Sequence, residues 1–139
     1  MSRSQQDLII RALNGLTERA VSAIGLEVVA NLREDTPRDT GWARANWIGS
    51  KGRDAQGLDQ PEGKPTSANV AAARAASAEG EAAIVSYNLS DGLLYISNNV
   101  PYVPRLNSGS SSQAGEGFIE RAIERGVVST FRAMSRRSR

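Results

Sequence analysis

The side chains that carry most enzyme chemistry are missing from this sequence. Its 139 residues include no histidine and no cysteine. The chain therefore has no imidazole base, no catalytic thiol, no Ser-His-Asp triad and no histidine or thiolate zinc site. It also has no P-loop and no Gly-x-Gly-x-x-Gly segment after a strand. We expect no cofactor, no metal site and no small-molecule substrate.

Carboxylates are the remaining candidates for catalysis. Three of them recur at four-residue spacing, which places them on one face of a helix: Glu116, Glu120 and Glu124. Paired carboxylates can drive glycoside hydrolysis, but local pairing with Arg121 and Arg125 is a sufficient explanation for them. Asp39 lies in a turn-like segment, where an aspartate usually bonds to backbone N–H groups. We predict no enzymatic activity; a hydrolase would lose its activity on substitution of Asp39 or Glu116.

The elements that position these residues begin with a long helix, predicted from about Ser4 to Glu34. Ser4 is expected to cap it, with Asp7 as the reciprocal partner. One apolar stripe follows helical spacing: Ile9, Leu13, Leu16, Ala20, Ile24 and Val28. Such a stripe usually belongs to the core, and a face between subunits is the alternative.

The next segment is predicted to turn and then form a strand. Pro37 ends the helix, and the four residues after it form a tight turn. A strand is expected over Trp42–Gly49, with Trp47 in the core and Trp42 as an interface anchor. Residues 50–65 contain three glycines and two prolines. We expect them to form a flexible loop, because loops of this length are usually functional or mobile.

The second half predicts two helices and a strand. Thr66 or Ser67 caps a helix that continues to about Asn88, with a strand over residues 81–89 as the alternative. A strand follows over Leu93–Ser97, then a bent turn and a flexible loop at 107–117. The last helix runs from Gly115 or Glu116 to Met134, and its best apolar stripe is formed by Ile119, Ile123, Val127 and Phe131.

Together these elements predict the fold class. We expect an α+β fold in a single domain over residues 1–139. Its long N-terminal helix and its C-terminal helix pack on a small, mostly antiparallel sheet, with long loops between the elements.

Charge gathers at the C-terminal end, although the net charge is only +2. Four arginines lie within eight residues: Arg132, Arg136, Arg137 and Arg139. They are candidates for contacts with DNA phosphates or an acidic partner, and residues 135–139 form a basic tail. The rest of the chain is nearly neutral and lacks an aromatic platform for single strands, which argues against a dedicated DNA binder.

No apolar run is long enough for a membrane span, and MSRSQQD lacks the apolar core of a signal peptide, so we expect cytoplasmic synthesis.

Two sequence blocks resemble a protein family. The first is Thr36-Pro-Arg-Asp-Thr-Gly-Trp-Ala-Arg-Ala-Asn-Trp47. The second is Tyr95-Ile-Ser-Asn-Asn-Val-Pro-Tyr102, with Leu106, Gly109, Ser112-Gln113-Ala114 and Phe118 to Ala122 after it. Both are similar to the neck or tail-completion proteins (head–tail joining, tail-component proteins) of long-tailed bacteriophages. The likeness covers roughly Leu8 to Val127. Asn107 replaces an acidic residue common in the family, and Gly115-Glu116 replace a proline, which changes the expected loop contacts.

The resemblance implies a virion structural protein. Its subunits would form a homo-oligomeric ring, sixfold or twelvefold, which joins the head connector to the tail at the head–tail junction. Phage DNA would pass through the lumen with only non-specific contacts, and the connector or adaptor and tail proteins would be partners. The interface candidates are Trp42, Arg44, Tyr102, Arg105, Leu106, Asn107, Gln113 and Phe118. A tail terminator or connector stopper is the alternative within the same assembly, and a small basic DNA-associating protein is the alternative of another class.

Overall fold

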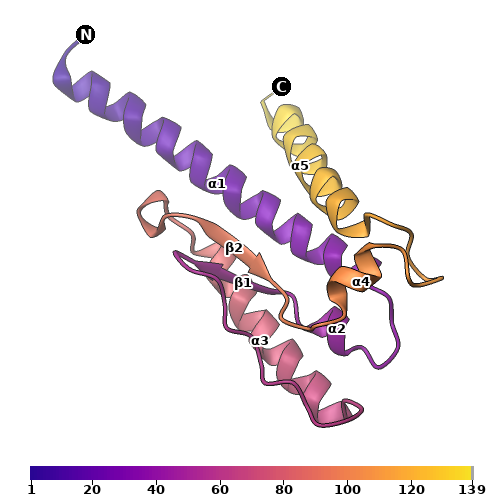
Figure 1. Ribbon diagram of the computed structural model, residues 1–139. Helices are drawn as coiled ribbons and strands as arrows, with labels where there is room; N and C mark the ends of the chain where they lie inside the picture. Colours follow the sequence, from indigo (N-terminus) through magenta and orange to yellow (C-terminus); the bar gives the residue numbers. More distant parts are fainter. Residues whose placement is uncertain (139) are drawn as a thin grey trace.

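The computed structural model describes residues 1–138. Its elements in chain order are α1 (Arg3–Asp35), α2 (Trp42–Ala45), β1 (Ile48–Lys51), α3 (Ser67–Val85), the 3-10 turn η1 (Leu89–Asp91), β2 (Leu94–Ser97), α4 (Val103–Asn107) and α5 (Phe118–Arg137). Figure 1 shows α1 running across the molecule, with α5 against one side and the sheet and α3 on the other. The predicted α+β class is confirmed.

The sheet consists of β1 and β2, which pair antiparallel with Ile48 opposite Ser97. α3 packs closely against β1, because Gly49 and Gly80 carry no side chain where the two backbones meet. A Cβ on Gly80 would lie 2.6 Å from the Gly49 nitrogen. Ile84 of α3 fills the space between β1 and α1 and is fully buried. The sheet is therefore held between α3 and α1.

α1 begins earlier than predicted. Ser2, not Ser4, is the N-cap: its hydroxyl accepts from the Gln5 N–H at 3.2 Å, and the Gln5 side chain accepts from the Ser2 N–H at 2.8 Å. This capping box uses a glutamine where we expected Asp7. At the other end, Thr36 is fully buried, and the Trp47 indole N–H donates to its hydroxyl at 2.8 Å.

The strand predicted over Trp42–Gly49 is wrong except at its last two residues, Ile48 and Gly49. Gly41 adopts φ of +87°, which starts the one-turn helix α2, and the strand begins only at Ile48. Three of the four α2 residues are buried (Trp42, Ala43 and Ala45), so there is no alternation of buried and exposed faces. Packing of this turn into the core overrides the strand propensity of the tryptophans.

Helix boundaries in the second half also differ from the predictions. Thr66 caps α3 as expected, but α3 ends at Val85 rather than Asn88. The alternative strand over residues 81–89 is absent, since these residues continue α3 and enter η1. α4 was not predicted, although Pro104 in its first turn suits a helix start. α5 starts at Phe118, because Gly117 before it has φ of +77°.

α5 buries a line of residues that is mostly small and does not bury its larger apolar stripe. The buried line is Phe118, Ala122, Gly126 and Thr130. A Cβ on Gly126 would lie 2.6 Å from Val28 Cγ2 and 3.1 Å from the Val28 nitrogen. The two helices thus cross almost in backbone contact. The predicted stripe of α5 lies beside this line, with Ile123 and Phe131 exposed.

Candidate functional site

The two sequence blocks that carry the family resemblance meet in space. The Gln113 side chain accepts from the Arg38 N–H at 2.6 Å and donates to the Arg38 carbonyl at 3.2 Å. The Asn98 amide donates to the Ala43 carbonyl at 2.8 Å. Gln113, an interface candidate, is therefore engaged in joining the loop after α4 to the turn before α2.

The side chains of three further interface candidates are buried or hydrogen-bonded within the fold. Trp42 is 2% exposed, and its indole N–H donates to Gln60 at 3.0 Å. Arg44 donates to the Thr36 carbonyl from two nitrogens, at 3.2 and 2.9 Å, and so satisfies the carbonyl end of α1. Phe118 is 1% exposed. Trp42 is a core residue, and its predicted role as an exposed anchor is wrong.

The candidates around α4 are more accessible. Tyr102 is 42% exposed, and partial burial of its hydroxyl raises its pKa. Arg105 is exposed, while Leu106 packs partly against the core. Asn107 caps α5: its side-chain oxygen Oδ1 accepts from the Ile119 N–H at 2.9 Å, and its side-chain amide donates to both Glu120 oxygens at 3.0 Å. This amide lowers the pKa of Glu120.

Asn99 has a structural role that we did not predict from the sequence. Its amide donates to the carbonyls of Gln56 and Leu58, at 3.2 and 2.8 Å. Leu58 also packs against the core. The loop at 50–65 therefore has fixed points of contact with the turn after β2, and the mobility of both long loops stays a prediction. The paired asparagines of the second sequence block were the available signal.

An uncovered apolar surface lies on the first half of α1. We call residues Arg3–Thr17 the arm; apart from the partly covered Gly15, every residue in it is exposed. Figure 1 shows these turns extending beyond the rest of the molecule. The arm carries five large exposed apolar side chains: Leu8 (64%), Ile9 (46%), Ile10 (54%), Leu13 (58%) and Leu16 (46%). The predicted core stripe of α1 is thus in the core only at its C-terminal end.

An apolar groove opens beside the crossing of α1 and α5. We define it by Val21, Ile24, Leu94, Ile96, Ile119 and Ile123, which come from α1, β2 and α5. Leu94 and Ile96 are partly buried, and Ile123 is 44% exposed. Val127 and Phe131 extend the apolar surface along α5 toward its C-terminus. The groove therefore provides a surface on which an apolar helix face can pack.

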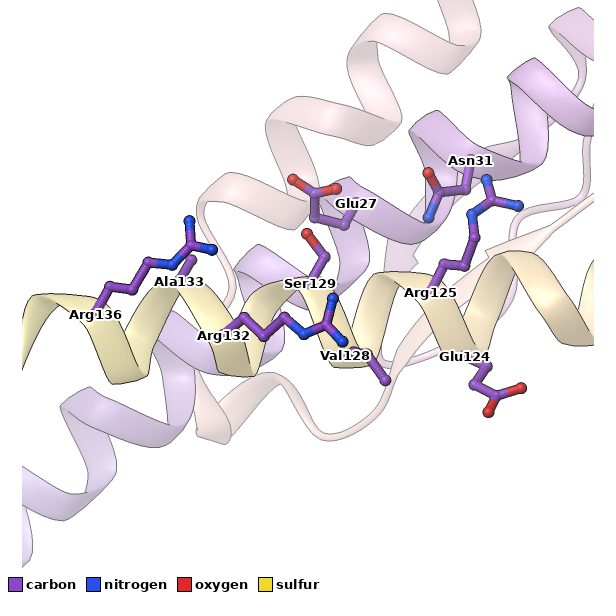
Figure 2. A pocket seen from close by; sticks show the side chains of 9 residues that line it. All are labelled: Glu27, Asn31, Glu124, Arg125, Val128, Ser129, Arg132, Ala133 and Arg136. Atoms are coloured by element: carbon purple, nitrogen blue, oxygen red, sulfur yellow. The ribbon is translucent and has the colours of Figure 1, made fainter.

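A basic groove lies on the other side of α5 (Figure 2). Glu27 and Asn31 of α1 line it together with Arg125, Arg132 and Arg136 of α5. Arg125 is bound to Asp35 at 2.6 Å, whereas Arg132 and Arg136 have no ion-pair partner among residues 1–138. Glu124 also lines this groove, from the side of α5 away from α1. Two of the predicted basic contacts thus share one groove. Arg137 does not line it, and Arg139 lies outside the described residues.

A second basic hollow, unforeseen from the sequence, lies between the end of α1, α2 and α3. Four arginines line it: Arg33, Arg38, Arg44 and Arg74. Arg33 is bound to Glu81 at 2.5 Å and to the Ser77 hydroxyl, and Arg44 to backbone carbonyls. Two of the four arginines in this hollow therefore already hold the elements together.

Comparisons with known proteins found no relative of this chain. No protein-family model, curated protein or solved structure matches the chain. Within residues 1–138, every helix is too short or too polar to span a membrane. In the same part of the chain, acidic side chains nowhere gather in the groups of three or more that could hold a metal ion.

Proposed function

We propose that this chain is a structural subunit of the neck of a long-tailed bacteriophage. Copies of it associate into a closed ring between the head connector and the tail, and the ring lines the path of the DNA. The observation that carries this proposal is the arm. A contiguous apolar surface on a helix that extends away from its own domain is typical of a surface that binds another protein chain.

The motif residues support the same function indirectly. The residues that resemble the phage family (Gln113, Asn98 and Asn99) bind backbone groups of distant segments. They keep the turn before α2, the loop at 50–65 and the loop after α4 in fixed relation. A ring subunit needs this rigidity, because a closed ring forms only when each contact repeats the same rotation.

The carboxylates that were weighed for catalysis have other roles in this proposal. Glu120 binds the amide of Asn107, and Glu124 lies on the exposed side of α5. The protein therefore acts by association and has no enzymatic activity in this proposal.

Native mass spectrometry of the purified chain tests the function, alone and mixed with connector and tail proteins. We expect a complex of six or twelve copies, formed by the chain alone or only on the connector. Mass spectrometry of purified phage particles should then detect the chain. The proposal would be contradicted if the chain is absent from particles and is monomeric both alone and in the mixture with connector and tail proteins.

A DNA-associating protein is the second candidate, and the basic groove is the observation that favours it. Arg132 and Arg136 lie on successive turns of α5 and face the groove. Duplex binding measured across salt concentrations separates the two functions. A dedicated DNA binder would show tight binding with a steep salt dependence that weakens in the double variant Arg132→Ala/Arg136→Ala. A ring subunit that only lets DNA pass would bind weakly at physiological salt.

A further inference from the structure

We propose that the arm of one subunit binds the apolar groove of a second copy of the same chain, in a head-to-tail contact. This inference rests on the proposed function and identifies the two surfaces that build the ring. The arm and the groove are different surfaces, so the contact is heterologous, which is the type that generates rings.

The arm cannot occupy the groove of its own subunit. α1 is one continuous helix from Arg3 to Asp35, and Val21 and Ile24 of the same helix line the groove. A straight helix cannot fold back on itself. The apolar side chains of the arm therefore become covered only when they contact another molecule.

Three of the five large apolar residues of the arm lie on one face, and Leu8 and Ile10 lie about 100° to either side of it. With about 100° of rotation per residue, Ile9, Leu13 and Leu16 fall within a sector of about 60°. The charged residues nearest this face are Arg3 and Arg19, while Asp7 and Arg11 lie on the opposite side. The arm thus presents an apolar face with basic borders.

The groove and the adjoining stripe of α5 complement that face in length and in charge. At 1.5 Å per residue, Leu8 to Leu16 spans about 12 Å, and Ile119 to Phe131 spans about 18 Å, so the arm fits along the stripe. Glu120 and Glu124 lie beside the N-terminal half of the stripe on α5, whereas Arg132 and Arg136 line the surface beside Val127 and Phe131 in its C-terminal half. The acidic border of the N-terminal half of the stripe and the basic borders of the arm favour this pairing over arm against arm, where arginine would face arginine.

Disulfide cross-linking tests the contact, and the absence of natural cysteine makes the result unambiguous. Leu13 lies in the middle of the arm face and Val127 in the middle of the α5 stripe. Chains with Leu13→Cys are mixed with chains with Val127→Cys, and the mixture is oxidised both as concentrated purified protein and in assembled particles. We expect mixed dimers in at least one preparation and few dimers from either variant alone. Arg11→Cys, on the opposite side of the arm, is the matched control and should form none with Val127→Cys.

Each outcome decides one of the two proposals. Absence of the mixed dimer from both preparations overturns the interface and leaves the neck function standing if the chain is found in particles. Two other results also overturn the interface. One is dimers formed by Leu13→Cys chains alone, and the other is a cross-link between Leu13→Cys and a cysteine introduced into a different protein. Mixed dimers from a chain that never enters particles support the interface and contradict the neck function. As a second measure, Leu13→Asp should weaken association at least tenfold and leave thermal unfolding unchanged, since the arm is exposed.

Discussion

Two glycine substitutions test the helix crossing on which both grooves depend. Gly126 lies on α5 against α1, and Gly15 lies on the arm. In an open helix, Gly→Ala stabilises by about 1 kcal/mol, because alanine restricts the unfolded chain and favours the helix. At Gly15 the nearest atom to an added Cβ is the end of a flexible side chain, Arg19 Nη1 at 3.2 Å. We expect Gly15→Ala to raise the free energy of unfolding by about this 1 kcal/mol.

Gly126→Ala meets a different environment. Its Cβ would lie 2.6 Å from Val28 Cγ2 and within 3.3 Å of the Val28 nitrogen and Cα, and backbone atoms cannot move aside cheaply. Forcing extra volume into a packed contact costs about 1–3 kcal/mol. After subtraction of the helix gain of about 1 kcal/mol, Gly126→Ala should be destabilising by up to about 2 kcal/mol. The two variants should therefore differ by about 1–3 kcal/mol in the free energy of unfolding.

Urea denaturation followed by circular dichroism measures this difference, with unchanged m-values as the check that both variants unfold like the parent chain. In thermal unfolding, a difference of 1 kcal/mol corresponds to roughly 4 °C for a domain of this size. If Gly126→Ala stabilises the protein as much as Gly15→Ala does, the close crossing is wrong. Val28→Ala combined with Gly126→Ala should cost less than the sum of the two single substitutions, since Val28→Ala removes the nearest clashing atom.

Three further predictions concern single side chains. Trp42→Ala should lower the free energy of unfolding by about 3–5 kcal/mol in urea denaturation, because removal of a buried aromatic side chain leaves a cavity. A loss of association without a loss of stability would instead support Trp42 as an interface anchor. Thr130→Val should stabilise the fold by about 1 kcal/mol, since the buried Thr130 hydroxyl has no hydrogen-bond partner among the described residues; a loss of stability in the same assay would reveal a partner for the hydroxyl. Asn107→Ala should return the lowered pKa of Glu120 toward 4.5 in an NMR titration. Because the pKa of Glu120 is lower in the folded chain, the interaction with Asn107 stabilises the protein above the unfolded pKa and is lost as the pH falls through the folded pKa. An unchanged Glu120 titration in Asn107→Ala would refute this role of Asn107.

The sequence predicted those parts of the fold that local signals determine. The long helices and the Leu94–Ser97 strand follow from periodicity, and Thr66 follows from cap chemistry. Trp42 was misplaced because an aromatic residue after a turn is compatible with a strand or a helix, and only the surrounding core selects between them. The sequence also could not show where α1 leaves the core. Ile9 and Ile24 lie on one apolar stripe, and their different exposure depends on how far the other elements extend along α1.

The crossing at Gly126 and Val28 accounts for both the uncovered arm and the two grooves. Because small residues bring α1 and α5 together near the C-terminal half of α1, the larger side chains of α5 remain beside the contact and not within it. Ile123 therefore borders the apolar groove, Arg132 borders the basic one, and the arm remains uncovered. A larger residue at position 126 would push α5 away and alter the groove that we assign to a neighbouring arm. Gly126→Ala should thus weaken the Leu13–Val127 cross-link as well as the fold, whereas Gly15→Ala should leave the cross-link intact.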